Sequence, residues 1–241
     1  MKTRKIILLL NLMIIISIAI SCKKFVEVDG PNTSLNEANI YQKDATAAAV
    51  LTGIYTNLSN NFLTAGDLMS TSFVAGLSSD ELVLYNTTNN TDLNSYYTNT
   101  LNSQSSIVFW SNIYTKLYIV NAAIKGISNS TTLNPTVKQQ LLGEALFMRA
   151  FCFFYLVNLY GDVPLVLTTD YKVNASMTRT SKELVWEQIV KDLKDAQKML
   201  SSNYLDATLL KITSEKVRPT RWSATALLAR TYLYLKDWTN A

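Results

Sequence analysis

The 241-residue sequence contains no histidine, only two cysteines and comparatively few charged residues. The absence of histidine removes histidine-dependent acid–base catalysis and histidine metal ligands, which makes enzyme interpretations less favourable. Charged residues form 17% of the chain, against a usual share of about a quarter. With seven glycines and four prolines, long helices are easy to accommodate. The composition therefore accommodates long helices, and we expect a non-catalytic protein that needs no metal and no cofactor.

The charge is nearly balanced once the N-terminus is set aside. The formal net charge is +4, but three basic residues, Lys2, Arg4 and Lys5, lie in the first five positions. Without these three, 19 basic residues stand against 18 acidic ones. Such a balance predicts no strong attraction to nucleic acid or to anionic surfaces.

The N-terminus has the pattern of a targeting segment. A basic start is followed by an apolar core over residues 6–20, and small residues precede Cys22. We therefore predict a secretory signal peptide over residues 1–21. Residues 19–22, Ala-Ile-Ser-Cys, resemble a bacterial lipobox, in which cleavage leaves Cys22 as a lipidated N-terminus that acyl chains anchor to a membrane. The alternative is an ordinary signal peptide followed by a chance cysteine. Residues 22–38 then form the lipidated cysteine and a tether.

Cys152 lies between phenylalanines within a long apolar run. With Cys22 acylated it has no partner, so no disulfide is expected. Without a histidine to activate it, we interpret Cys152 as a buried structural thiol and not a nucleophile.

The segment over residues 143–165, GEALFMRAFCFFYLVNLYGDVPL, predicts the central helix. A helix that is apolar on nearly all sides is usually buried or spans a membrane. The uncharged run after Arg149 is too short to span, so we expect a core helix. It should begin near Asn134-Pro135 and end at Gly161. Glu144 and Arg149 are five residues apart and should satisfy groups on different neighbouring helices.

Other segments predict helices over residues 44–58, 108–127 and 181–200, because apolar residues recur at helical spacing. We expect Trp110 in the core and Asn121 in a bridge between helices. Leu184 should join the buried stripe of the third of these helices. Beyond Pro164 the chain should be extended up to a turn near Arg179, and residues 201–217 should form a polar connection.

The central segment also resembles the signature helix of the RagB/SusD family of outer-membrane nutrient-binding lipoproteins. The matching residues are Glu144, Ala145, Arg149, Ala150 and the Gly-Asp-Val-Pro-Leu run of 161–165. The last segment, RPTRWSATALLARTYLYLKDWTNA, resembles another stretch of that family and the first helix of a tetratricopeptide repeat. The resemblance implies an all-α, tetratricopeptide-like helical repeat scaffold with long loop insertions. Family members are roughly twice as long, so we expect residues 39–241 to be the N-terminal helical domain, without its C-terminal half.

Residues 63–106 differ from the rest of the chain. They are crowded with Asn, Thr and Ser, and a long stretch without regular pattern is usually functional or disordered. Amides, hydroxyls and aromatic faces suit a sugar ligand. The alternative is a solvated loop held down by tyrosines. The candidate glycan-binding residues are Asp80, Tyr85, Asn94, Tyr96 and Tyr97.

The resemblance implies a lipoprotein anchored to the outer membrane and exposed on the cell surface, although Lys23 and Lys24 replace the acidic residues that often follow the cysteine. It would capture an oligosaccharide or polysaccharide and pass it to a TonB-dependent transporter. The alternative is a tetratricopeptide-type protein–protein scaffold or a peptide-binding lipoprotein. A hydrolase is disfavoured, because the adjacent Asp80 and Glu81 cannot by themselves supply two carboxylates about 5–10 Å apart.

Overall fold

The computed structural model describes residue 4 and residues 37–60, 64, 68, 70–85, 90–103 and 107–241. The predicted signal peptide, Cys22 and most of the tether lie outside the described residues. The compact unit extends from Glu37 to Ala241, close to the domain start predicted at residue 39.

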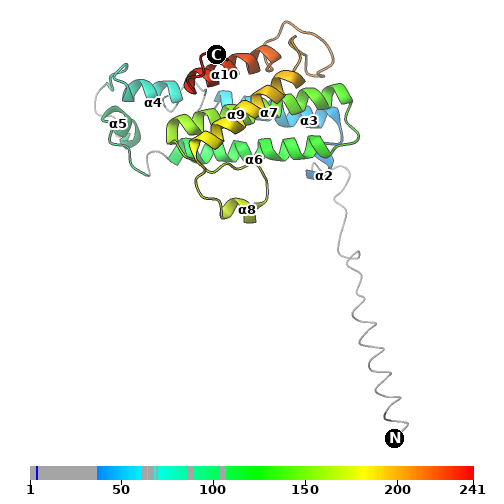
Figure 1. The fold of residues 1–241 in the computed structure, drawn as a ribbon, viewed down its shortest axis with the longest axis horizontal. Helices are drawn as coiled ribbons and strands as arrows, with labels where there is room; N and C mark the ends of the chain where they lie inside the picture. Colours follow the sequence, from blue (N-terminus) through cyan, green and yellow to red (C-terminus); the bar gives the residue numbers. More distant parts are fainter. Residues whose placement is uncertain are drawn as a thin grey trace. The chain divides into compact units, whose positions relative to one another are not determined.

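The described part of this unit is helical and contains no β-strand, as predicted for the all-α class (Figure 1). Two isolated β-bridges join Val163 to Thr180 and Leu205 to Ile212. The helices are α2 (Glu37–Ile40), α3 (Asp44–Asn60), α4 (Thr71–Ser78), α5 (Thr91–Tyr97), α6 (Ile107–Asn129), α7 (Pro135–Tyr160), α8 (Tyr171–Ala175), α9 (Lys182–Met199) and α10 (Arg221–Tyr234).

Helix α7 is the centre of the fold, as its apolar sequence predicts. It packs against α6 and α9, α3 contacts α6 and α7, and α10 packs on α9. Its length and composition would allow it to cross a membrane, but 78% of the apolar 18-residue stretch that meets this criterion is buried inside the protein. This burial is that of a core helix. The stack of successive helices agrees with the predicted tetratricopeptide-like scaffold.

The ends of α7 follow from local chemistry. The Asn134 side chain accepts a hydrogen bond from the Thr136 backbone N–H at 2.9 Å, and Pro135 occupies the first turn, where its missing N–H costs nothing. Gly161 adopts φ 66° directly after the helix, a conformation that glycine reaches without strain. Both predicted boundaries are confirmed.

Two predictions about the elements were wrong in part. Residues 63–106 were expected to lack regular structure, yet α4 and α5 form there because Ser70 and Asn90 cap their first turns. Residues 165–180 were expected to be extended, yet they contain the short helix α8.

The buried stripe expected for α9 is confirmed at Ile189, Leu193, Ala196 and Leu200, but not at Leu184. Leu184 is 51% exposed, whereas Val185 and Ile189 are fully buried. Because each residue turns an α-helix by about 100°, the residue next to a buried position can point to solvent. Val185 and Ile189, four residues apart, define the buried face, and Leu184 lies beside it.

Candidate functional site

A pocket of about 590 Å³ lies between α4 and α5 on one side and α6 and α7 on the other. This size falls within the range of about 300–1,000 Å³ that is usual for small-molecule sites. Aliphatic, aromatic and hydroxyl side chains line it together. The lining residues are Thr71, Val74, Ala75, Ser78, Ser79, Tyr96, Leu101, Phe109, Leu159 and Tyr160.

Helices α4 and α5 are held together by hydrogen bonds between their C-terminal ends. The Ser78 hydroxyl donates to the Tyr96 carbonyl at 3.0 Å, and the Asn99 side-chain amide donates to the Ser78 carbonyl at 3.2 Å. The two helices lie together at one end of the helical stack (Figure 1). The wall that carries Ser78 and Tyr96 is therefore a defined pair of helices and not an irregular loop.

Two tyrosines bring phenol groups to this pocket. Burial, followed by the negative charge of Asp92, raises the pKa of Tyr96. Burial likewise raises the pKa of Tyr160 to about 12. Both hydroxyls are therefore neutral at physiological pH, and a neutral phenol can both donate and accept hydrogen bonds.

Thr71 adds a hydroxyl without a protein partner. Its Oγ1 atom is buried and makes no hydrogen bond among the described residues. Buried polar atoms are nearly always paired, so Thr71 leaves an unsatisfied hydroxyl beside the pocket within the described part of the chain. The pocket lining thus combines rings, hydroxyls and aliphatic carbons.

The predicted site residues are only partly brought together. Tyr96 is buried and lines the pocket. Tyr97 packs beside the core, while Asp80, Tyr85 and Asn94 are exposed and outside the pocket lining. Their roles in glycan binding remain predictions. Thr71 and Tyr160, which also line the pocket, were not predicted, because no local motif connects residues so far apart in the chain.

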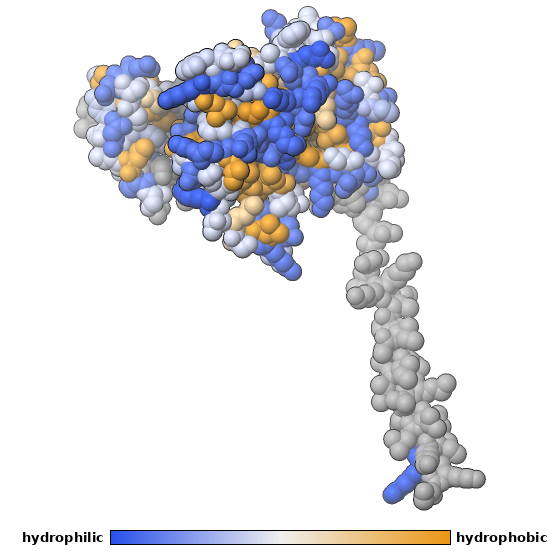
Figure 2. Space-filling view, viewed as in Figure 1, coloured by the Kyte–Doolittle hydropathy of each residue, from blue (hydrophilic) through white to orange (hydrophobic). Residues whose placement is uncertain are grey.

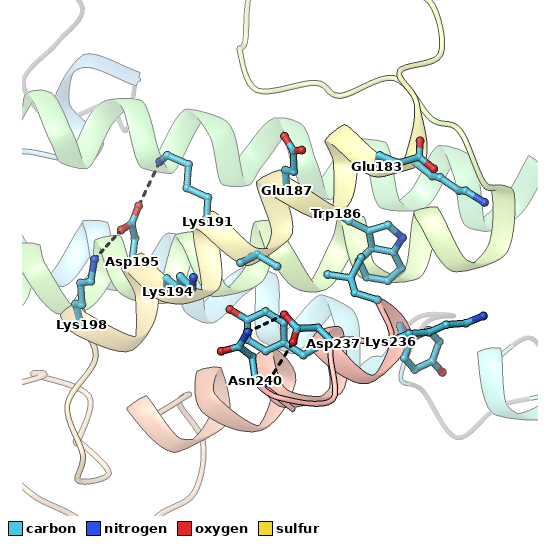
Figure 3. A pocket seen from close by; sticks show the side chains of 15 residues that line it. Glu183, Trp186, Glu187, Lys191, Lys194, Asp195, Lys198, Lys236, Asp237 and Asn240 are labelled. Carbon is cyan, nitrogen blue, oxygen red and sulfur yellow. Dashed lines mark hydrogen bonds and ion pairs between the residues drawn. The ribbon is translucent and has the colours of Figure 1, made fainter.

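A second hollow, of about 870 Å³, lies between α9 and α10 (Figure 3). The aromatic residues Trp186, Tyr232 and Tyr234 line it together with many charged side chains. Lys191 and Lys198 both point to Asp195, with N–O distances of 3.2 Å and 3.6 Å. Figure 2 shows apolar patches between hydrophilic stripes on the face that carries these helices. This densely charged lining is less suited to an uncharged sugar than the α4–α7 pocket.

The buried charged residues of α7 are occupied by structural contacts. Glu144 accepts hydrogen bonds from Arg218 and Tyr55, both at 2.8 Å, and Arg149 pairs with Asp192 at 2.7 Å. The prediction that Glu144 and Arg149 serve neighbouring elements is confirmed. Among the described residues, no group of three or more acidic, cysteine or histidine side chains is placed to hold a metal.

Three further predictions concern side chains around α6 and α7. Cys152 is fully buried and unpaired, and burial raises the pKa of its thiol to about 12. Trp110 packs on the core, 5.2 Å from the Tyr160 ring centroid. Asn121 donates to the Val166 carbonyl at 2.8 Å and accepts a hydrogen bond from Arg149. All three structural interpretations are confirmed.

Comparison with known families supports the resemblance seen in the sequence. A family model named SusD-like, described as "Starch-binding associating with outer membrane", matches residues 24–233. A SusD-like protein of Formosa agariphila is 24% identical over 229 residues, which cover 90% of this chain and 41% of that protein. A SusD-like protein of Bacteroides ovatus is 28% identical over 134 residues, which cover 54% of this chain and 23% of that protein.

Solved structures show the same fold. A laminarin-binding SusD-like protein superimposes with a TM-score of 0.72 at 22% identity, over 83% of this chain and 42% of that one. A SusD homologue of Bacteroides thetaiotaomicron gives a TM-score of 0.68 at 22% identity, over 88% of this chain and 41% of that one. The chain therefore spans well under half of the length of these relatives.

Proposed function

Since the chain belongs to the SusD-like family, we propose that it captures a glycan in the pocket between α4, α5, α6 and α7. The family description names starch binding and association with the outer membrane, and one structural relative is named for binding laminarin. These names support a glycan as the ligand class. The size and lining of the pocket support it as the binding site.

The observation that carries the proposal is the presence of rings and hydroxyls in one pocket. Tyr96, Phe109 and Tyr160 supply aromatic rings, and Thr71 supplies a buried hydroxyl without a partner. A pyranose has apolar C–H faces and a belt of hydroxyls, so it needs both kinds of contact. Aromatic rings with a polar end meet that requirement.

The proposed setting is the cell surface. A lipid on Cys22 would hold the protein at the outer membrane, and the captured glycan would pass to a TonB-dependent transporter. No catalytic step is proposed, because Glu144 and Arg149, the buried charged residues of the central helix, are both held in structural ion pairs. Replacing Cys22 by serine should abolish labelling by a radioactive fatty acid and release the protein from membranes. Persistent labelling would contradict this anchor.

Glycan binding is tested by calorimetry on the mature chain with a panel of neutral and charged oligosaccharides. For a glycan that binds, Thr71→Val should weaken the affinity about fivefold, which corresponds to one hydrogen bond of about 1 kcal/mol. Thr71→Val keeps the side-chain shape, and the hydroxyl it removes has no protein partner. It should therefore leave the unfolding midpoint unchanged or slightly higher.

The contribution of the tyrosine hydroxyl is tested with the matched variants Tyr160→Phe and Tyr118→Phe. Tyr160 lines the pocket, whereas Tyr118 on α6 is 52% exposed and outside the pocket lining. Only the first variant should lose affinity. Absence of binding to every glycan, or equal affinity in all three variants and the wild type, would contradict the proposal. If Trp186→Ala were the only variant that lost affinity, the glycan would bind in the second hollow, between α9 and α10.

A further inference from the structure

We propose that the α4–α7 pocket selects uncharged glycans and excludes sulfated or uronic-acid glycans, because the chain segment that forms one wall carries only negative charge. The inference rests on the proposed function and adds the class of ligand. Within residues 63–106 the charged side chains are Asp67, Asp80, Glu81 and Asp92, and the segment contains neither lysine nor arginine. An anionic glycan in this pocket would approach acids without a compensating cation from this segment.

Two of these acids lie next to the pocket along the chain. Asp80 and Glu81 directly follow Ser78 and Ser79, which line it, and both acids are exposed. Their backbone position is defined, because the Leu82 N–H donates to the Gly76 carbonyl at 3.0 Å across this turn. Asp80 takes φ 62°, a left-handed conformation in which aspartate is enriched. The turn holds the two carboxylates near the end of α4.

The third acid reaches the pocket through α5. Asp92 lies in the first turn of α5, four residues before Tyr96, and residues four apart share a helix face. The carboxylate of Asp92 acts on the phenol that lines the pocket, since its charge adds to burial in raising the pKa of Tyr96. The negative field of this wall therefore extends to a pocket-lining group.

On the opposite wall, the cation Arg179 lies beside a lining residue. Arg179 donates a hydrogen bond to the Tyr160 carbonyl at 3.3 Å, and its guanidinium lies over the Trp110 ring, 5.0 Å from the centroid. The Asp162 carbonyl also accepts from Arg179. These contacts hold the guanidinium in the junction between α7 and the following segment. An anionic ligand would have to compete with them.

Measurements at different salt concentrations separate the repulsion of an anionic glycan from the recognition of its sugar. Repulsion between exposed like charges is screened over about 8 Å at physiological ionic strength and over longer distances at lower salt. We expect a sulfated glycan to bind about tenfold more weakly than its neutral parent at low salt. This gap should shrink as salt is added. Binding of the neutral parent should be nearly independent of salt.

The experiment uses the mature chain with neutral starch, β-glucan, xylan and mannan oligosaccharides, each compared with its chemically sulfated form. The matched variants are Glu81→Lys beside the pocket and Glu215→Lys in the 201–217 connection, both at exposed positions. Both reversals change the net charge equally. Glu81→Lys should tighten binding of the sulfated form severalfold at low salt, and Glu215→Lys should not. Asp80→Asn with Asp92→Asn gives the same test without adding a cation.

Equal affinity of the wild type for neutral and sulfated forms at low salt would overturn the inference while leaving the proposed glycan binding intact. An identical response to Glu81→Lys and Glu215→Lys would also overturn it, because the effect would then come from net charge alone. Failure of every neutral glycan to bind would remove the proposed function, and the inference would fall with it.

Discussion

Arg149 of α7 and Asp192 of α9 form a two-point ion pair inside the protein, with Nε–Oδ2 and Nη2–Oδ1 distances of 2.7 Å. Their side chains are 9% and 0% exposed. Asn121 of α6 accepts a hydrogen bond from Arg149, and Gln188 donates one to Asp192 at 2.8 Å. The guanidinium and carboxylate therefore join three helices of the stack through satisfied polar contacts.

Breaking this pair should destabilise the protein severely. We expect Arg149→Met to lower the free energy of unfolding by about 3–5 kcal/mol, because Asp192 would remain buried without its cation. Urea denaturation measures this loss. Lys191→Met removes an exposed partner of Asp195 and should cost less than about 1 kcal/mol. Equal losses in the two variants would contradict a special role for the buried pair.

The double variant Arg149→Met with Asp192→Leu tests whether the loss comes from the unpaired charge of Asp192. Replacing both charges by apolar side chains removes the unpaired charge, so part of the lost stability should return. A double variant that is less stable than Arg149→Met alone would show that Asp192 serves its other contacts more than the ion pair.

The Glu144–Arg218 pair should make stability depend on pH once Arg218 is replaced. Burial raises the pKa of Glu144, and the charge of Arg218 opposes that rise. In Arg218→Met the pKa should rise further. When the pKa of Glu144 is higher in the folded state than its unfolded value of 4.5, this residue contributes stability below pH 4.5. That contribution is lost as the pH rises through the folded-state pKa.

The deficit of Arg218→Met relative to the wild type should therefore be smaller at about pH 5 than at about pH 8. Urea midpoints at both pH values measure the difference. Adding Glu144→Gln supplies the control, because the double variant has no buried carboxyl to titrate at this position. A deficit that is independent of pH in the single variant would contradict this account.

Tyr160 should contribute to alkaline unfolding. Burial raises the pKa of its phenol from 10.0 to about 12. Its stabilising contribution is fully present below pH 10.0 and is lost as the pH rises toward about 12. Tyr160→Phe should flatten the fall in melting temperature across this window. Tyr171→Phe, at a position that is 73% exposed, is the control and should follow the wild type.

Two glycines should respond in opposite ways to alanine. A Cβ atom at Gly126 would lie 2.0 Å from Cδ2 of the Tyr41 ring, whereas one at Gly53 would meet nothing within 4 Å. Gly126→Ala should therefore destabilise the protein by about 1–3 kcal/mol, because the buried ring must move. Gly53→Ala, within α3, should stabilise it by up to about 1 kcal/mol. Thermal melting of both variants is the measurement.

The long helices could be predicted from the sequence because their signals are local. The apolar run, Asn134-Pro135 and Gly161 together determine α7, and apolar periodicity determines α6 and α9. The short helices α4 and α5 were missed because they have only eight and seven residues, too few for apolar residues to recur over several turns. The structural interpretation of Glu144 and Arg149 also followed from the sequence, since no histidine accompanies them.

Only the tertiary structure decided which residues meet. Asp192 lies 43 residues from Arg149, and Arg218 lies 74 residues from Glu144. Thr71, Tyr96 and Tyr160 reach one pocket from three different helices. Helical periodicity determines which face of a segment is buried, but it does not determine which other segment covers that face. The sequence by itself therefore determined the long helices and most of their apolar faces, whereas the packing of those faces decided the ion pairs and the pocket.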